Sequence, residues 1–340
     1  MKLAPVIVFN YNRPDHSQQV WNALAKNVYA ADTELYLYCD GPKAVNELKS
    51  ERIRELGGYD AYTAPILQVQ SLAKQYAIEA PKQGKFKVVH VVGAEQNKGL
   101  ANSIIGGVTD VINKHGRVIV LEDDLLTSPY FLKYMNEALE RYDNRKSVST
   151  ICANRPPLNK LHIPEDYNYD VFVTPRPMST GWATWKDRWN QVDWSMNYLH
   201  SLLQHPYQID ALNRMGTDVL HMLMLQKDHK IDSWAVQYCY AHYANHAVAI
   251  MPCASYVDNI GFDGTGIHSG TNGKDHHNNV SLAPANPRWL DVLYEDKRII
   301  NAFHAYCNIH KLPLWKRAIR KIYRMVGSVP PAYVEPKVYM

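Results

Sequence analysis

Four apolar, β-forming runs alternate with helical patterns in the first 150 residues of this 340-residue chain. The runs are "PVIVFNY" (5–11), "ELYLYCD" (34–40), "KFKVVHVV" (85–92) and "RVIVLEDD" (117–124). Strands separated by helices pair in parallel, because each helix returns the chain to the same edge of the sheet. The sequence therefore predicts an α/β fold: a doubly wound, Rossmann-like, mostly parallel sheet flanked by helices.

The alternation ends near residue 150, and aromatic residues, Pro and Asn become frequent between 154 and 189. This composition is typical of a loop-rich binding region that covers the ends of a sheet. We therefore divide the chain into three expected parts, 1–150, 151–285 and a helical tail over 286–340.

Charge and cysteine content exclude several classes of protein. A formal net charge of +4 is small for this length and gives no general nucleic-acid signature, so we expect no nucleic-acid partner. The five cysteines are scattered, odd in number and without CxxC spacing, which argues against a disulfide framework or a zinc site. No apolar run is long enough for a signal peptide or a membrane span. We expect a cytoplasmic protein.

The fourth run ends in three consecutive acids, Glu122, Asp123 and Asp124. Such acids often cap the next helix, but Ser128 and Pro129 are expected to fill that role as N-cap and first helical residue. The acids then lie at the carboxyl end of a central strand, where open α/β sheets bind ligands. Because adjacent carboxylates repel one another unless a cation lies between them, the sequence predicts a bound cation here.

Six segments in order carry a family resemblance: "VIVFNYNRP", "YLYCDGP", "EQNKGLANS", "VIVLEDDL", "TGWATWKDRW" and "NIGFDGTGIHS". Over roughly residues 4–270 the chain resembles bacterial glycosyltransferases of the GT-A fold that assemble polysaccharides. More distantly, it is similar to family 2 glycosyltransferases and to the N-acetylglucosaminyltransferase I family. The resemblance implies that 1–150 binds a nucleotide sugar and that 151–285 binds the acceptor and carries catalysis. It also implies that Mn²⁺ or Mg²⁺ stabilises the diphosphate leaving group.

The resemblance also assigns roles to the acids. The "EDD" triplet is this chain's version of the DxD motif, with Asp124 as the direct metal ligand and Glu122 and Asp123 bonded to the donor's sugar or ribose. His268 would complete the metal site or contact the diphosphate, although an isolated His in a Gly-rich loop is often only a loop residue.

Further donor-binding residues follow from the same resemblance. Asn12 and Arg13 would lie beside the nucleotide, and Asp40 would accept a hydrogen bond from the base. At the start of a helix whose amides would point at the nucleotide, the candidates are Asn97, Gly99 and Asn102. Each segment also has a purely structural interpretation, as an ordinary polar turn or a loop-to-helix junction.

Three tryptophans, Trp182, Trp185 and Trp189, are spaced by three and four residues, which predicts one face of a helix or turn. We expect Trp185 and Trp189 in the core. Trp182 follows Gly181 and resembles the Gly-Trp element that lines the sugar-binding cleft in related families, where an indole face suits a pyranose.

An inverting transfer requires a general base on the acceptor hydroxyl. Asp232 precedes the apolar segment "SWAVQYCYAHY" and resembles the family's base-bearing segment. A helix N-cap is an alternative role for Asp232, and Asp187 and Asp193 are rival bases. A retaining mechanism, which needs no such base, stays open.

The tail contains "LWKRAIRKIYRMV" (314–326), whose basic and apolar residues fall on opposite arcs of a helical wheel. This pattern indicates either a helix on an anionic membrane surface or a helix packed on the body with a solvated basic face. A lipid-linked acceptor would favour the membrane.

Taken together, these features predict a metal-dependent, inverting glycosyltransferase that moves a sugar from a UDP-sugar to a saccharide acceptor of bacterial surface polysaccharide or lipopolysaccharide. The alternatives are a retaining enzyme and a non-catalytic saccharide-binding protein. A sugar nucleotidyltransferase would need a Gly-rich basic loop after the first strand, which "FNYNRPDHS" lacks.

Overall fold

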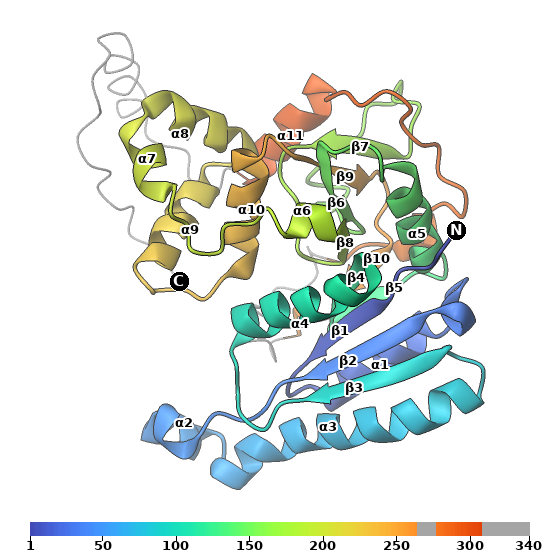
Figure 1. The fold of residues 1–340 in the computed structure, drawn as a ribbon, viewed down its shortest axis with the longest axis vertical. Coiled ribbons are helices and arrows are strands. Elements are labelled where there is room, and N and C mark those ends of the chain that lie inside the picture. Colours follow the sequence, from blue (N-terminus) through green and yellow to red (C-terminus); the bar gives the residue numbers. More distant parts are fainter. Residues whose placement is uncertain (264–276, 308–340) are drawn as a thin grey trace.

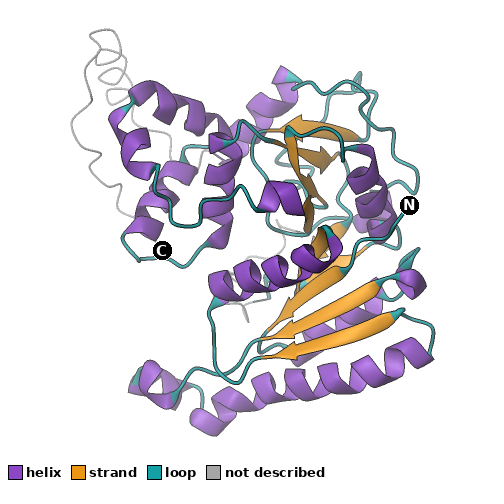
Figure 2. Cartoon of the chain, viewed as in Figure 1, coloured by secondary structure: helices purple, strands orange, loops and turns teal. Residues whose placement is uncertain are grey.

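The structure, a computed structural model, describes residues 1–263 and 277–307. Its centre is an eight-stranded sheet with the order β3-β2-β1-β4-β8-β6-β9-β7 (Figures 1 and 2). The four strands of the first half are β1 (Val6–Asn10), β2 (Glu34–Cys39), β3 (Val88–Gly93) and β4 (Arg117–Glu122). They pair in parallel, so their carboxyl ends lie along one edge. The expected α/β fold with helices flanking the sheet is confirmed.

The second half continues the same sheet rather than forming a loop-rich cover. Its strands are β6 (Val148–Cys152), β7 (Val171–Thr174), β8 (Trp182–Trp185) and β9 (Val248–Pro252). Strand β8 is antiparallel to both β4 and β6, β7 is antiparallel to β9, and β6 is parallel to β9. A separate pair, β5 (Leu125–Thr127) with β10 (Val257–Asn259), follows the acidic triplet directly. The sheet is therefore mixed and crosses the expected boundary near residue 150.

Helices cover both faces of the parallel strands. On one face lie α1 (Pro14–Leu24), α3 (Tyr59–Lys82) and α5 (Phe131–Arg141), and on the other lies α4 (Leu100–His115). In β1, Val6 and Val8 face the first group while Ile7 and Phe9 face α4. Burial on both faces explains why the central strands β1 and β4 are continuous apolar runs, whereas the edge strand β3 is partly exposed.

The remaining helices are α2 (Ser50–Glu55), α6 (Lys186–Trp189), α7 (Leu199–Gln204), α8 (Pro206–Leu212), α9 (Asp218–Lys227), α10 (Trp234–Ala244) and α11 (Lys297–Cys307). Short 3₁₀ turns lie at Ala30–Asp32, Val45–Glu47, Asn213–Met215 and Val280–Leu282. Within the two described ranges, no helix combines the length and apolar character needed to cross a bilayer. The basic segment 314–326 lies outside the described residues.

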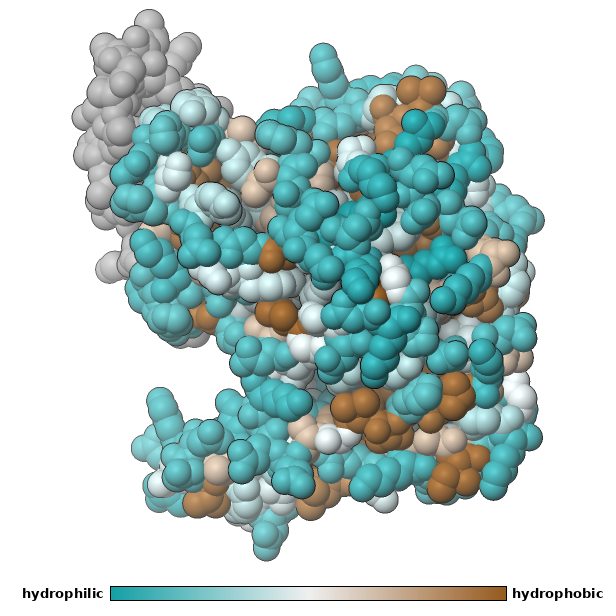
Figure 3. Space-filling view, in the orientation of Figure 1, coloured by the Kyte–Doolittle hydropathy of each residue, from teal (hydrophilic) through white to brown (hydrophobic). Residues whose placement is uncertain are grey.

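A hollow separates two parts of the molecular surface (Figure 3). It lies between the helical lobe α7–α10 and the part formed by α2 and the start of α3. The carboxyl ends of β1, β2 and β3 point toward it (Figure 1). The fold therefore places the strand ends that carry the predicted site residues beside an open space.

Candidate functional site

The acidic triplet at the end of β4 is paired with a cation supplied by the chain itself. Arg13, in the loop after β1, donates from Nη2 to Asp123 Oδ1 at 2.5 Å and to Asp124 Oδ2 at 3.1 Å. The side chains of Arg13 and Asp124 are 17% exposed and that of Asp123 is 5% exposed. The sequence predicted a positive charge among these acids. In this structure the guanidinium of Arg13 supplies a positive charge there.

Backbone contacts hold the two aspartates in place. Asp123 Oδ2 accepts from the amide of Tyr11 at 3.2 Å. The amide of Ile260, just after β10, donates to the carbonyl of Asp124 at 2.9 Å. The next residue, Gly261, packs so closely that an added Cβ would lie 2.3 Å from Asp124 Oδ2 and 3.0 Å from Arg13 Nη1. This position therefore has no room for a side chain.

Glu122 differs from its two neighbours, because its carboxyl makes no hydrogen bond or ion pair within the described ranges. Burial, reinforced by the charges of Asp124 and Asp123, raises the pKa of Glu122 to about 8. Burial also raises the pKa of Asp123, although Arg13 opposes this. One guanidinium thus faces three acids, and the triplet can accommodate more positive charge.

Asp40, at the end of β2, joins two strand-end loops. Its carboxylate accepts from Asn97 Nδ2 at 3.0 Å, from the amide of Lys98 at 3.0 Å and from the amide of Gly41 at 2.9 Å. Asn97 also donates to the carbonyl of Gly41 at 3.1 Å. The structure therefore brings two expected donor-binding residues, Asp40 and Asn97, into direct contact.

The start of α4 meets the second half of the chain. Gly99, the N-cap of α4, has φ +80°, and an added Cβ would lie 3.1 Å from Asp232 Oδ2. The same oxygen lies 3.5 Å from the amide of Ala101, in the first turn, where the helix dipole favours an anion. The N-cap of α10 is Ser233, whose hydroxyl accepts from the amide of Val236. Asp232 therefore does not cap its own helix and instead lies against α4.

Two other expected residues lie near these groups. Asn12 is half-buried in the loop between β1 and α1. Asn102 is exposed on α4, and its side chain donates to the carbonyl of Lys98 at 3.0 Å. His268 lies outside the described residues.

The rival base Asp187 lies on the opposite edge of the sheet. It belongs to α6, which follows Trp185, and Trp185 pairs with Arg117 at the start of β4. Ion pairs with Lys146 at 2.8 Å and Arg188 at 2.7 Å lower the pKa of Asp187, although burial opposes the shift. Asp187 is thus far from the acids, which lie at the other end of β4.

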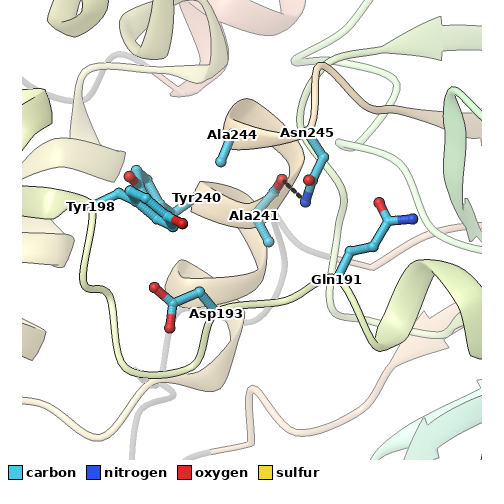
Figure 4. Close-up of a pocket in the computed structure, with 7 residues that line it drawn as sticks. All are labelled: Gln191, Asp193, Tyr198, Tyr240, Ala241, Ala244 and Asn245. Atoms are coloured by element: carbon cyan, nitrogen blue, oxygen red, sulfur yellow. Dashed lines mark hydrogen bonds between the residues drawn. The ribbon is translucent and has the colours of Figure 1, made fainter.

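The second rival, Asp193, lines a cavity of about 280 Å³ beside the C-terminal end of α10 (Figure 4). Its carboxylate accepts from the amides of Ser195 at 3.0 Å and Asn197 at 2.9 Å. Asp232 precedes the other end of α10, about 15 Å away at the usual helical rise. Asp193 therefore stabilises its own loop and lies at a distance from Asp232.

The expected sugar contact of Trp182 is wrong in this structure. Trp182 is 1% exposed, and its indole stacks on Trp234 at 5.1 Å and Trp189 at 5.7 Å between ring centroids. The three tryptophans also do not share a helical face, because Trp182 and Trp185 lie in β8 and project to opposite sides of the sheet. The predicted burial of Trp185 and Trp189 is confirmed.

We expect Trp182→Ala to destabilise the protein by about 3–5 kcal/mol, the usual cost of removing a buried aromatic side chain. Urea unfolding followed by circular dichroism measures this change. Trp182→Phe, which keeps an aromatic ring, should lose less. A stable Trp182→Ala protein with selectively weakened sugar binding would contradict the burial argument.

Ser128 is not the N-cap of α5. That helix begins at Phe131, and Tyr130 is its N-cap. Ser128 Oγ accepts from the amide of Tyr130 at 3.3 Å, so it stabilises the turn before the helix. Strand β5, which was not predicted, lies between the acidic triplet and this turn.

Sequence reasoning also missed four contacts among the loops that follow the strands. Tyr11 OH and Tyr62 OH are 2.6 Å apart, and Tyr62 OH accepts from the amide of Lys43 at 3.0 Å. His16 Nε2 lies 3.2 Å from Asp263 Oδ2, and Gly261 lies against Asp124. Of these residues, only Gly261 and Asp263 belong to a motif that the sequence analysis had singled out, the "GFDGTG" segment.

The acidic triplet offers carboxylate oxygens, which are the ligand type that hard divalent cations prefer. Asp124 is partly exposed, and Glu122 has no hydrogen bond in the described part of the chain. Among the described residues, however, no group of three His, Cys, Asp or Glu side chains is arranged to hold a metal. A cation at this site would have to share Asp124 with Arg13 or displace it.

No protein-family model and no curated protein matches the chain. Among solved structures, it is similar to S. aureus TarS 1-349, with a TM-score of 0.37 and 11% identity over 74% of this chain and 59% of that one. A second structure of S. aureus TarS gives a TM-score of 0.38 and 12% identity over 75% of this chain and 36% of that one. This chain therefore spans 59% and 36% of the two solved chains. Both similarities are too low to bear on activity.

Proposed function

We propose that the protein is a glycosyltransferase that transfers a sugar from a nucleotide donor, a UDP-sugar, to a saccharide acceptor. The observation that supports this best is the grouping at the carboxyl edge of the parallel strands. Arg13, Asp40 and the acidic triplet come from three strand ends, and Asp232 comes from the second half. Ligands bind at such edges in open α/β sheets. A nucleotide diphosphate sugar offers a base, charged phosphates and hydroxyls to these groups.

Each group has a part in this proposal. Asp40, held by Asn97, would accept from the base, and the backbone around Gly99 would allow close approach of the nucleotide. Glu122 and Asp123 would accept hydrogen bonds from donor hydroxyls. Asn12 and Asn102 would line the same edge.

We propose Mn²⁺ or Mg²⁺ as the cofactor, with Asp124 as a ligand and His268, outside the described residues, as a second. When bound, the ion would neutralise charge on the departing diphosphate. Asp124 is kept in position for this by the amide of Ile260 and by the close backbone of Gly261.

The proposed general base is Asp232, which would take the proton of the acceptor hydroxyl in an inverting transfer. It is exposed, whereas Asp123 and Asp124 are engaged by Arg13. A retaining enzyme would not need this base and stays an alternative. A non-catalytic saccharide-binding protein is less well supported, because Trp182, its main sequence feature, is buried.

The proposed acceptor is a saccharide of bacterial surface polysaccharide or lipopolysaccharide, free or lipid-linked. Residues 314–326 would bind an anionic membrane surface, which would place the protein on the cytoplasmic face of the membrane. This part of the proposal rests on the sequence pattern alone.

A donor-hydrolysis screen tests the proposed function. The protein is incubated with a panel of nucleotide sugars and Mn²⁺ or Mg²⁺, and the released nucleotide is measured. We expect slow hydrolysis of one UDP-sugar and none in Asp124→Asn. If no nucleotide sugar is hydrolysed or bound while an oligosaccharide binds, the saccharide-binding alternative would replace the enzyme.

A further inference from the structure

We propose that the cavity beside the C-terminal end of α10 binds one neutral sugar residue of a saccharide, separately from the strand-end cluster. The cavity has a volume of about 280 Å³ (Figure 4). This volume is close to the lower end of small-molecule pockets, about 300 Å³, so it suits a single sugar ring rather than a chain. The inference goes beyond the proposed transfer and does not depend on it, because it concerns saccharide binding alone.

Two segments of the chain form the cavity (Figure 4). They are the loop before α7, with Gln191, Asp193 and Tyr198, and the C-terminal part of α10 with the residue after it, Tyr240, Ala241, Ala244 and Asn245. Asp193 holds the loop in place, because its carboxylate accepts from the amides of Ser195 and Asn197. Hydrogen bonds to the backbone therefore fix the loop wall against the helix wall.

Tyr240 gives the strongest reason to expect a ligand. It is 4% exposed, and its hydroxyl makes no hydrogen bond in the described part of the chain. A buried tyrosine hydroxyl usually has a partner, because leaving it unpaired costs the desolvation of a polar group. Burial, reinforced by the nearby Tyr243 and Asp193, raises the pKa of Tyr240 to about 12, so the hydroxyl stays protonated at neutral pH. A group that enters the cavity can accept its hydrogen bond.

Tyr198 and Gln191 add the other groups that a sugar needs. Tyr198, the N-cap of α7, is 65% exposed and lines the cavity. Within residues 1–263 and 277–307, neither its hydroxyl nor the side-chain amide of Gln191 has a hydrogen-bond partner. An aromatic ring can cover the apolar face of a pyranose, and an amide both donates to and accepts from hydroxyls. The cavity thus combines an aromatic surface with unused polar groups.

The charge of the cavity argues against an anionic ligand. Asp193 is the one carboxylate among its lining residues, and none of the described residues that line it is Lys or Arg. A phosphate or carboxylate would meet negative charge here without a cation to pair with it. The cavity therefore suits a neutral saccharide rather than a nucleotide diphosphate. Asp232, the proposed general base, precedes the other end of α10, about 15 Å away.

The test titrates wild type and variants with methyl glycosides, without nucleotide, by saturation-transfer-difference NMR. The panel contains both anomers of the glycosides of glucose, galactose, mannose, rhamnose and N-acetylglucosamine. We expect at least one of them to bind, and Tyr198→Ala to weaken that binding by at least about tenfold, the scale of removing an aromatic anchor. Tyr207→Ala is the matched control, because Tyr207 lies on α8 of the same lobe, is 67% exposed and does not line the cavity. It should bind as wild type does.

Tyr240→Phe tests the buried hydroxyl and leaves the ring in the core. We expect about fivefold weaker binding of the same glycoside, the scale of one hydrogen bond. Urea unfolding should be unchanged, because the hydroxyl has no partner among the described residues. Tyr243→Phe is the control: its ring centroid lies 6.1 Å from that of Tyr240, and it does not line the cavity. Weaker binding at unchanged stability cannot result from damage to the fold.

The proposal is overturned if no methyl glycoside binds to the wild type. It is also overturned if the affinity is unchanged by Tyr198→Ala or by Tyr240→Phe, since the sugar then binds elsewhere, or if Tyr207→Ala weakens binding as much as Tyr198→Ala. The proposed function is tested separately by nucleotide release, which these titrations do not measure. Either proposal can therefore fail without the other.

Discussion

Asp124→Asn should lower sugar transfer by roughly a hundredfold to a thousandfold while leaving the fold intact, the scale of losing one strong electrostatic contact in a reaction centre. Asparagine keeps the volume of aspartate and removes its charge, so the expected loss lies in cation binding. The fold should survive because Arg13 keeps its 2.5 Å contact with Asp123 and the carbonyl of Asp124 keeps the amide of Ile260. Transfer is measured at metal concentrations below saturation, and the fold is checked by circular dichroism.

Glu140→Gln is the matched control for this experiment. Glu140 pairs with Arg117 at 3.1 Å, at the amino end of the strand whose carboxyl end leads into Asp124. The substitution Glu140→Gln removes the same charge as Asp124→Asn, but at a distance from the site. Because a surface ion pair contributes little to stability, the rate of transfer should stay within about twofold of wild type. Wild-type turnover of Asp124→Asn under limiting metal would exclude Asp124 as the ligand.

The first half of the sheet was predictable because its central strands, β1 and β4, are buried on both faces. Runs such as Val6–Phe9 lie between α1 and α3 on one side and α4 on the other, so every position is apolar. A pattern this simple can be recognised in the sequence without knowledge of its partners.

The second-half strands were missed because their polar residues depend on distant partners. In β6, Thr150 is buried and bonded to His242 Nε2 at 2.7 Å and to Tyr238 OH at 2.8 Å. In β8, the hydroxyl of Thr184 donates to the carbonyl of Ser149 at 2.7 Å. A local pattern cannot show that these hydroxyls are satisfied. The tryptophan spacing in 182–189 then favoured a helix over the strand that forms.

The acids of the candidate site were predictable and their partner was not. Three carboxylates after a buried strand require positive charge wherever they lie. That Arg13 supplies it depends on β1 and β4 being neighbours, which brings residues 110 positions apart into contact. The close approach of Gly261 depends in the same way on the pairing of β10 with β5.

Asp232→Asn should retain wild-type affinity for donor and metal and lower turnover by roughly a hundredfold or more, the usual scale for losing general-base catalysis. The base must lie away from the departing diphosphate, and Asp123 and Asp124 are engaged by Arg13. Asp232 is exposed and comes from the second half, with Oδ2 3.5 Å from the amide of Ala101. The asparagine oxygen can keep that contact, so α4 should not be destabilised. Turnover is measured with saturating donor, and affinity is measured by calorimetry.

Asp228→Asn is the matched control, because Asp228 is an exposed acid four residues earlier whose partner, Lys230, lies at 3.5 Å. It should leave turnover unchanged, as should Asp193→Asn, whose carboxylate only fixes the loop at Ser195 and Asn197. Normal turnover of Asp232→Asn would remove this residue from the mechanism. The anomeric configuration of the product, read by NMR, then decides between the remaining possibilities. An α-linked product from an α-linked donor means a retaining reaction that needs no such base. An inverted product means that an acid other than Asp232 takes the proton.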